Sequence, residues 1–83
     1  MIKVYTWPDC PNCEKLKSWL RDHNIEFDIQ SFTTAVQTDF IMNNIFGSPP
    51  ILETSQGVLI GEELFKKHDL QEESVRRLIV DNP

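Results

Sequence analysis

Hydrophobic and polar positions alternate in some segments of the chain and follow a helical period in others. Residues 2–7 (IKVYTW) and 26–32 (EFDIQSF) alternate between apolar and polar side chains, which is typical of strands. In the second segment, Ile29 lies on the apolar face. Residues 50–54 and 58–60 are two short apolar segments around a Ser-Gln-Gly turn, so they predict a hairpin.

Four other segments predict helices. Residues 11–23 carry an apolar stripe of helical spacing, and Pro11 stands at the first helical position, where proline is favoured. The other predicted helices are residues 34–44, which Thr33 or Thr34 caps, 62–68 and 70–80. The apolar side chains expected to face inward from the first two helices are Leu16, Trp19, Leu20, Val36, Phe40 and Ile41.

The element order is therefore β-α-β-α-β-β-α, with one further helix at the end. The first β-α-β unit is expected to be parallel and right-handed, and the last two strands are expected to be antiparallel. These pairings predict an α/β fold with a four-stranded mixed sheet flanked by helices. A chain of 83 residues makes one domain, residues 1–83.

The composition is that of an ordinary globular protein, with 40% hydrophobic and 25% charged residues. The formal net charge of −5 disfavours binding to nucleic acid phosphates or to an anionic membrane surface. The first ten residues lack the apolar run of a signal peptide, and no segment approaches the roughly 20 apolar residues of a membrane span. We therefore expect a cytoplasmic protein without nucleic acid or membrane partners.

The two cysteines, Cys10 and Cys13, form a Cys-Pro-Asn-Cys motif where the first strand gives way to the first helix. In the cytoplasm such a pair is more often catalytic or metal-binding than structural. Free N–H groups and the helix dipole stabilise a thiolate there, so Cys10 is expected to attack and Cys13 to resolve. The negative charge of Asp9 repels a thiolate on Cys10 and so raises its pKa, whereas the positive charges of Lys15 and Lys17 act in the opposite direction at longer range. We therefore expect a moderately lowered pKa of Cys10.

Other interpretations of the cysteine pair stay open. The pair is half of a zinc site, for which His23 and His68 are the only further soft ligands, or it shares an iron–sulfur cluster between two chains. It can also be inert core filler. The proline within the motif and the strand-to-helix setting favour redox chemistry without a metal.

A second motif, residues 47–52 (GSPPIL), places a proline at the start of the third strand. With this proline, Pro50, and with the cysteine motif, the chain resembles the glutaredoxins and the thioredoxin superfamily over nearly its whole length. Gly61 followed by Glu62 and Glu63 after the fourth strand is similar to that family as well. The resemblance implies a thioredoxin-like fold.

The resemblance also implies that the strand-opening proline is cis, lies beside the cysteines, and follows a residue that pairs with the substrate backbone. Carried over, Pro50 is the cis-proline and Pro49 is the pairing residue. Pro49 has no N–H, so it can accept a hydrogen bond from the substrate but cannot donate one. If Pro49 were cis instead, Ser48 would pair normally; we prefer Pro50 because it runs straight into the strand.

The family binds glutathione through a basic residue before the cysteines and through N–H groups after a Gly-Gly pair. This chain has Thr-Trp-Pro-Asp before Cys10, and a single glycine, Gly61, before two glutamates. An acidic site without a cation near the cysteines should bind anionic glutathione weakly, while N–H groups at Glu62 can still meet its carboxylate. The two glutamates can equally be a solvated first helical turn. Trp7 either covers the disulfide within an apolar docking face or is a half-buried strand end.

We therefore predict a glutaredoxin-type dithiol–disulfide oxidoreductase that reduces protein or glutathione mixed disulfides through Cys10 and Cys13. We expect a monomer without a metal or a tightly bound cofactor, which takes electrons from glutathione or from a flavoprotein reductase. The alternatives are a thioredoxin-like electron donor, for example to ribonucleotide reductase, a zinc or iron–sulfur module, and an interaction domain without redox chemistry. The expected substrate-binding residues are Trp7, Pro49, Pro50, Gly61 and Glu62.

Overall fold

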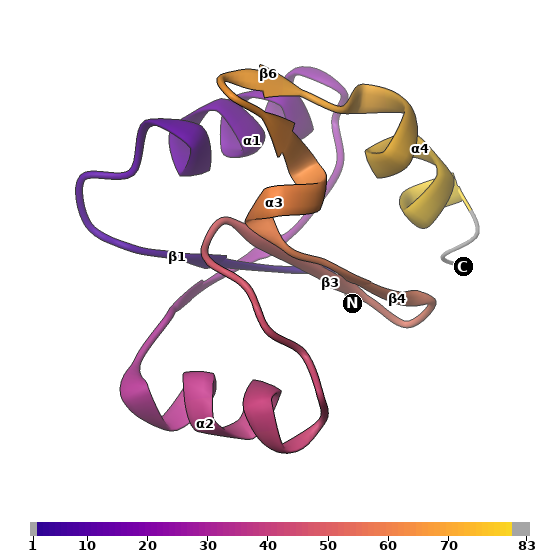
Figure 1. Ribbon diagram of the computed structural model, residues 1–83. Helices are drawn as coiled ribbons and strands as arrows, with labels where there is room; N and C mark the ends of the chain where they lie inside the picture. Colours follow the sequence, from indigo (N-terminus) through magenta and orange to yellow (C-terminus); the bar gives the residue numbers. More distant parts are fainter. Residues whose placement is uncertain (1, 81–83) are drawn as a thin grey trace.

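The computed structural model describes residues 2–80, which form a four-stranded mixed sheet with helices on both faces (Figure 1). The strands are β1 (Lys3–Thr6), β2 (Asp28–Ser31), β3 (Ile51–Thr54) and β4 (Gly57–Leu59), and they lie in the order β2-β1-β3-β4. β1 is parallel to β2 and antiparallel to β3, and β3 and β4 form an antiparallel hairpin. The predicted sheet and its strand directions are confirmed.

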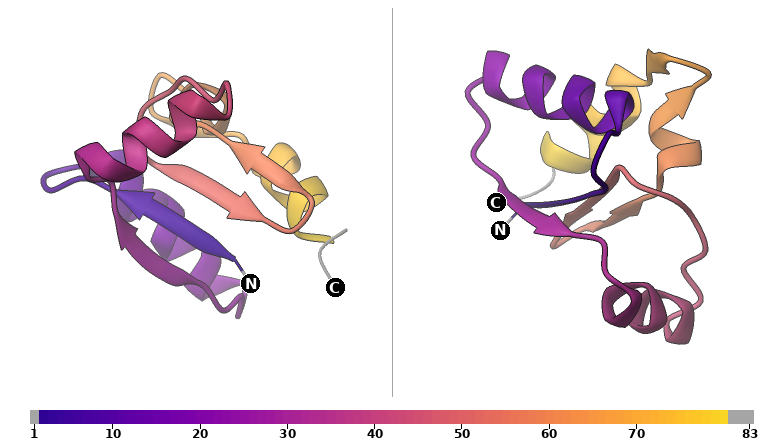
Figure 2. Two further views of the ribbon diagram at one scale, coloured as in Figure 1. Left: turned by 90° about the horizontal axis from the view of Figure 1, so that it is seen from below. Right: turned by 90° about the vertical axis from the view of Figure 1, so that its left-hand side faces the viewer.

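Three helices cover one face of the sheet and one helix covers the other. α1 (Pro11–Asp22), α3 (Gly61–Leu64) and α4 (Glu72–Val80) lie on one side, and Figure 2 shows α2 (Thr34–Met42) alone on the opposite side. The hydroxyl of Thr33 accepts the N–H of Val36 at 3.2 Å and caps α2, as expected for a threonine at a helix start. No helix within residues 2–80 is long and apolar enough to cross a membrane.

The larger hydrophobic core lies between the sheet and the helices α1, α3 and α4. Side chains alternate along a strand, so Leu52 of β3 points into this core while its neighbour Ile51 points to the other face. Leu16 and Leu20 lie one turn apart on α1 and are both fully buried, which fixes α1 and the cysteine motif at its start against the sheet. The buried members are Ile2, Val4, Leu16, Leu20, Leu52, Leu64, Phe65 and Val75.

The smaller core lies under α2 and consists of Tyr5, Phe32, Phe40 and Ile51. The rings of Tyr5 and Phe40 meet edge to face with centroids 5.0 Å apart. Ile41, which we expected to face inward, is 45% exposed because its neighbour Phe40 takes the inward position on α2. Ile29 is 50% exposed because β2 is an edge strand that the helices leave uncovered at this point.

The predicted helix over residues 62–68 is wrong in length. The helix α3 ends at Leu64, and the chain continues as a small hairpin of β5 (Phe65–Lys66) and β6 (Asp69–Leu70). Leu64 and Phe65 are consecutive and both buried in the larger core, and an extended backbone after Leu64 allows this. Lys67, at the turn, has a φ of 59°, which no right-handed helix can accommodate.

Candidate redox site

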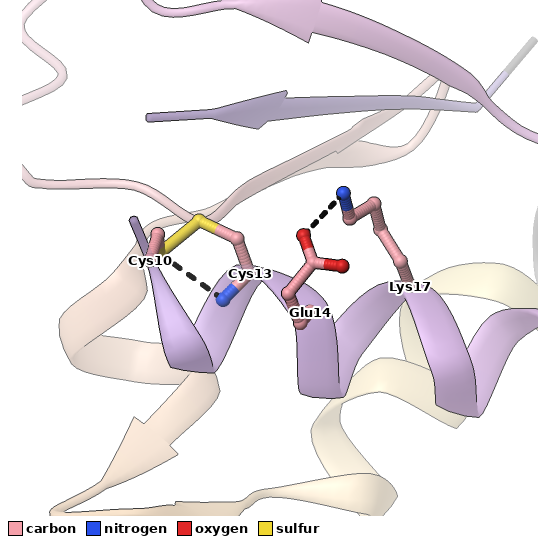
Figure 3. A network of polar contacts seen from close by, with 4 residues as sticks. All are labelled: Cys10, Cys13, Glu14 and Lys17. Atoms are coloured by element: carbon pink, nitrogen blue, oxygen red, sulfur yellow. Dashed lines mark hydrogen bonds and ion pairs between the residues drawn. A yellow bond between two sulfur atoms is a disulfide. The ribbon is translucent and has the colours of Figure 1, made fainter. Parts of the chain in front are cut away.

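The two cysteines lie at the start of α1 and are joined by a disulfide bond (Figure 3). Cys10 is the N-cap residue, with extended backbone angles, and Pro11 occupies the first helical position. The N–H of Cys13 donates to the Sγ of Cys10 at 3.1 Å, so this sulfur takes the place of a capping side-chain oxygen. The sequence motif therefore places the sulfur of Cys10 at the N-terminus of α1, where the first helical N–H groups have no partner within the helix.

The two sulfur-bearing residues differ in exposure. Cys13 is completely buried, whereas Cys10 is partly exposed. A sulfur atom of another molecule can therefore approach Cys10 but not Cys13. This difference agrees with the order of attack and resolution that the sequence predicts, although the roles themselves remain predictions.

The two lysines expected to offset Asp9 are both engaged elsewhere. Lys17 forms an ion pair with Glu14 at 2.5 Å, one turn beyond the cysteines (Figure 3). The side chain of Lys17 is only 13% exposed, against 68% for Glu14. The Nζ of Lys15 donates to the carbonyl of His68 at 2.9 Å, which ties α1 to the turn between β5 and β6.

The peptide bond between Pro49 and Pro50 is cis, which confirms Pro50 as the cis-proline. Both prolines are buried. Ser48 could not serve as the pairing residue in this conformation, because its N–H donates to Glu62 at 3.0 Å and its carbonyl accepts from the N–H of Gly61 at 2.8 Å. The carbonyl of Pro49 is left as the predicted acceptor for a substrate backbone.

Three N–H groups at the start of α3 are bonded within the chain, and that of Glu62 is not among them. The N–H of Gly61 is bonded to Ser48, and those of Glu63 and Leu64 both donate to the carbonyl of Ile60 at 2.9 Å. Glu63 reaches back to the N–H of Ile60 at 3.1 Å, as the third residue of a capping box does. Most donors of this helical turn are therefore used within the chain.

The carboxylate of Glu62 holds the loop before the cis-proline. Its two oxygens accept the backbone N–H of Ser48 at 3.0 Å and the hydroxyl of Ser48 at 3.3 Å. The hydrogen bond from the Ser48 backbone lowers the pKa of Glu62 below its usual value. Glu62 is thus neither a purely solvated residue of a first helical turn nor a free side chain, and a role in substrate binding remains a prediction.

Gly61 allows α3 to approach the same loop closely. A Cβ atom at this position would collide with the carbonyl oxygen of Ser48 and would lie 3.1 Å from the carbonyl oxygen of Pro49. Both atoms belong to the backbone, so neither can move aside as a flexible side chain can. Glycine is therefore required sterically here, whether or not the residue contacts a substrate.

Trp7 is half exposed and leans toward the smaller core. It is 45% exposed, and its ring meets that of Phe32 at an angle of 69° with centroids 5.7 Å apart. The indole is therefore partly packed as a strand-end residue and partly open to solvent three residues before Cys10. A contact between Trp7 and a substrate remains a prediction.

The sequence analysis missed a basic segment that the fold brings to the cysteine motif. Asn12, between the two cysteines, donates through Nδ2 to the carbonyl of Lys67 at 3.5 Å. The β5–β6 turn thus places the backbone of Lys67 beside α1, a proximity that the sequence did not predict. The run Lys66-Lys67-His68 is evident in the sequence, but the prediction of a helix over residues 62–68 gave no reason to place it at a turn beside α1.

Comparison with known proteins agrees with this geometry. The family model described as Glutaredoxin matches residues 2–33, which include the cysteine motif. An uncharacterized glutaredoxin-like 8.6 kDa protein in the rubredoxin operon of Clostridium pasteurianum is 52% identical over 27 residues, which are 32% of this chain and 36% of that protein. The crystal structure of the thioredoxin-like protein BC3987 superimposes with a TM-score of 0.72 at 25% identity, covering 94% of this chain and 99% of that one.

These matches support a place for the chain in the glutaredoxin and thioredoxin superfamily. The chain has the thioredoxin-like fold, with the Cys10–Cys13 pair at the start of α1, and this combination supports a redox role. Among residues 2–80, no group of three or more His, Cys, Asp or Glu side chains is arranged to hold a metal ion.

A longer relative carries a different name. The global transcriptional regulator Spx of Enterococcus faecalis is 32% identical over 63 residues, which are 76% of this chain. The alignment covers only 38% of that regulator, so this glutaredoxin-like chain corresponds to less than half of it. The name and activity of that regulator belong to the longer protein.

Proposed function

We propose that this chain is a glutaredoxin-like dithiol–disulfide oxidoreductase that reduces protein or glutathione mixed disulfides. The observation that carries the proposal is the Cys10–Cys13 disulfide at the N-terminus of α1, with one sulfur partly exposed and the other buried. A redox pair needs such an asymmetry, because one sulfur must meet the substrate and the other must reach only its neighbour.

The reduced protein reacts in two exchange steps. The thiolate of Cys10 attacks one sulfur of the substrate disulfide, so that a bond between Cys10 and the substrate forms while the substrate S–S bond breaks. The departing substrate sulfur takes the electron pair and a proton. Cys13, as thiolate, then attacks the Sγ of Cys10 and releases the second substrate thiol. The protein loses two electrons and two protons, and the substrate disulfide gains them as two thiols.

The local structure supports the first of these steps at Cys10. The N–H of Cys13 donates to the Cys10 sulfur at 3.1 Å, and the same donor is available to a thiolate in the reduced protein. The positive end of the α1 dipole adds to this stabilisation. The buried Cys13 stands one helical turn away, within reach of a mixed disulfide on Cys10.

The oxidised protein is returned to the dithiol either by two molecules of glutathione, which leave as glutathione disulfide, or by a flavoprotein reductase. Pro49 favours the second source, because it lacks the N–H that would bond the glutathione backbone. A thioredoxin-like electron donor is therefore the second candidate function, and the difference lies only in the reductant.

Coupled NADPH consumption with the oxidised protein as electron acceptor tests both candidates. One reaction contains glutathione and glutathione reductase, and the other contains a thioredoxin reductase. Turnover with glutathione makes the chain a glutaredoxin, and turnover with the flavoprotein alone makes it a thioredoxin-like carrier. If neither reductant gives turnover while the disulfide still forms and breaks reversibly, a redox-sensing role replaces the enzymatic one.

Two cysteine variants test the assignment of roles. We expect Cys10→Ser to abolish disulfide reduction, because the attacking sulfur is absent. We expect Cys13→Ser to accumulate a mixed disulfide on Cys10, visible as a mass increase that dithiothreitol removes. A Cys13→Ser variant that is inactive and forms no adduct would show that the two roles are assigned wrongly.

A further inference from the structure

The turn between β5 and β6 carries the basic residues Lys67 and His68 and contacts the first turns of α1. Asn12 Nδ2 donates to the carbonyl of Lys67 at 3.5 Å, and Lys15 Nζ donates to the carbonyl of His68 at 2.9 Å. Both hydrogen bonds use the backbone of the turn, so the side chains of Lys67 and His68 are not consumed by them. Both residues are exposed.

An open hollow of about 240 Å³ lies where this turn meets the redox site. Asn12 lines it on the side of the cysteine motif, Pro49 and Pro50 line it on the side of the cis-proline, and Lys67 closes it from the hairpin. The proposed function places the substrate between the cysteine motif and the cis-proline segment. A substrate whose sulfur is bonded to Cys10 would extend along this hollow.

The residues that line the hollow include one cation, Lys67, and one carboxylate, Glu62. Within residues 2–80, ion pairs are formed by Lys17, Arg76 and Arg77, and Lys67 takes part in none of them. Glu62, the carboxylate that lines the hollow, has one oxygen bonded to the N–H and the other to the hydroxyl of Ser48.

Two further observations concern the same place. The hairpin neighbour Lys66 is paired with Asp69 in the β5–β6 register and does not line the hollow, unlike Lys67. The Oδ1 atom of Asn12 is buried and has no hydrogen-bond partner within the described residues, although buried polar atoms are normally paired. Within residues 2–80, the Oδ1 atom of Asn12 is therefore an unpaired hydrogen-bond acceptor where the hollow meets the cysteine motif.

We propose that Lys67 binds a carboxylate which the substrate carries next to its reacting sulfur, and thereby selects anionic disulfides. This inference rests on the proposed function and adds the chemical class of the substrate. The carboxylate is either one of glutathione's own or that of an acidic residue flanking the cysteine of a protein. An exposed ammonium attracts such a group modestly, so Lys67 acts on substrate choice rather than on the exchange chemistry.

The test compares matched disulfides, one anionic and one neutral at the same positions. Glutathione disulfide is paired with its tetraethyl ester, and a cysteine peptide flanked by glutamates is paired with one flanked by glutamines. Each peptide is presented as a mixed disulfide with the same neutral thiol. The measured quantity is the second-order rate constant for oxidation of the reduced protein, taken as the ratio of the anionic to the neutral member of each pair. This ratio cancels any effect of Lys67 on the reactivity of Cys10 itself.

The variants are Lys67→Asn and Lys67→Asp. Asparagine and aspartate tolerate the left-handed backbone that Lys67 adopts, with a φ of 59°, so the turn should be preserved. Lys66→Gln removes the neighbouring charge and is the matched control. We expect Lys67→Asn to lower the ratio about threefold to fivefold and Lys67→Asp to lower it about tenfold, while Lys66→Gln changes it less than about twofold.

The two pairs of substrates distinguish the source of the carboxylate. A fall confined to the glutathione pair assigns Lys67 to glutathione, and a fall confined to the peptide pair assigns it to acidic protein substrates. Ratios that stay unchanged in both pairs, or that fall equally for Lys66→Gln, overturn the inference and leave the proposed function intact. A wild-type protein that oxidises with none of the four disulfides overturns the proposed function, and this inference with it.

Discussion

The two faces of the sheet are covered very differently. On one face, α1, α3 and α4 enclose eight buried side chains, and on the other face α2 covers only four. Large apolar side chains remain exposed around the smaller core, among them Ile41 at 45%, Phe46 at 65% and Met42 at 77%. The redox pair belongs to the densely covered side, because Cys13 is carried on α1.

This difference shows which part of the fold has to be held firmly. The sulfur of Cys10 must keep its position relative to Cys13 and to the cis-proline loop, and α1 supplies that position through the buried Leu16 and Leu20. The helix α2 carries none of the cysteines and contributes chiefly Phe40 to the core. Interiors that are packed on all sides leave large cavities on truncation, whereas thinly covered ones can relax.

The strongest test of the comparison uses neighbouring residues of β3. Ile51 and Leu52 are both at most 1% exposed and point to opposite faces. We expect Leu52→Ala to lower the free energy of unfolding near the upper end of about 2–5 kcal/mol, and Ile51→Ala near the lower end. Urea denaturation monitored by tryptophan fluorescence measures both. Equal costs would show that the smaller core is packed as tightly as the larger one.

The contact between α3 and the cis-proline loop should be the next most sensitive point. Gly61→Ala would drive a methyl group into the carbonyl of Ser48, so the loop or the helix must shift. We expect a loss of about 1–3 kcal/mol in the free energy of unfolding. The same urea titration measures this loss. An alanine variant as stable as the wild type would show that α3 and the cis-proline loop can move apart at no cost, although they lie on the densely covered side.

A smaller and pH-dependent effect is expected from Glu62. The pKa of this carboxyl is lowered in the folded protein by the hydrogen bond from Ser48, so its ionised form stabilises the fold above the unfolded value of about 4.3. We expect Glu62→Gln to cost less than about 1 kcal/mol near neutral pH, because the group is exposed.

The sign of that dependence provides the check. The difference in stability between wild type and Glu62→Gln should be full above the unfolded pKa and should shrink as the pH falls through the lower pKa of the folded state. Urea titrations at several pH values measure it. Glu26→Gln, a change at an exposed glutamate, controls for the loss of one negative charge. A difference that is constant over this range would remove the Ser48 contact as a source of stability.

The smallest effect is expected on the thinly covered side. Met42 is 77% exposed at the end of α2, so Met42→Gln should change the free energy of unfolding by no more than about 0.5 kcal/mol. Thermal denaturation is sufficient to measure it. A larger loss would show that the apolar side chains around α2 contribute to a core in solution, which would narrow the contrast between the two faces.

Local patterns of the sequence determined much of this protein. The alternation in residues 2–7 and the apolar stripe of residues 11–23 are properties of adjacent positions, and both predicted elements occur as β1 and α1. The N-cap position of Cys10 follows from the same neighbourhood, since a proline at the first helical position fixes where the helix starts. The cis form of Pro50 was predicted from the resemblance to the glutaredoxins, and it is allowed because only X-Pro bonds adopt the cis form at low cost.

Other features were decided by the tertiary structure alone. The donor on Asn12 and the carbonyl of Lys67 are 55 residues apart, and Glu62 and Ser48 are 14 apart. No periodicity in the sequence says which side chains will meet across such distances, because packing of the helices on the sheet brings them together. Packing also explains why α3 is shorter than predicted. Burial of both Leu64 and Phe65 in the larger core is favourable, and these consecutive side chains reach that core together only if the helix ends between them. The sequence alone therefore located the cysteine pair, and the fold decided which charged residues lie near it.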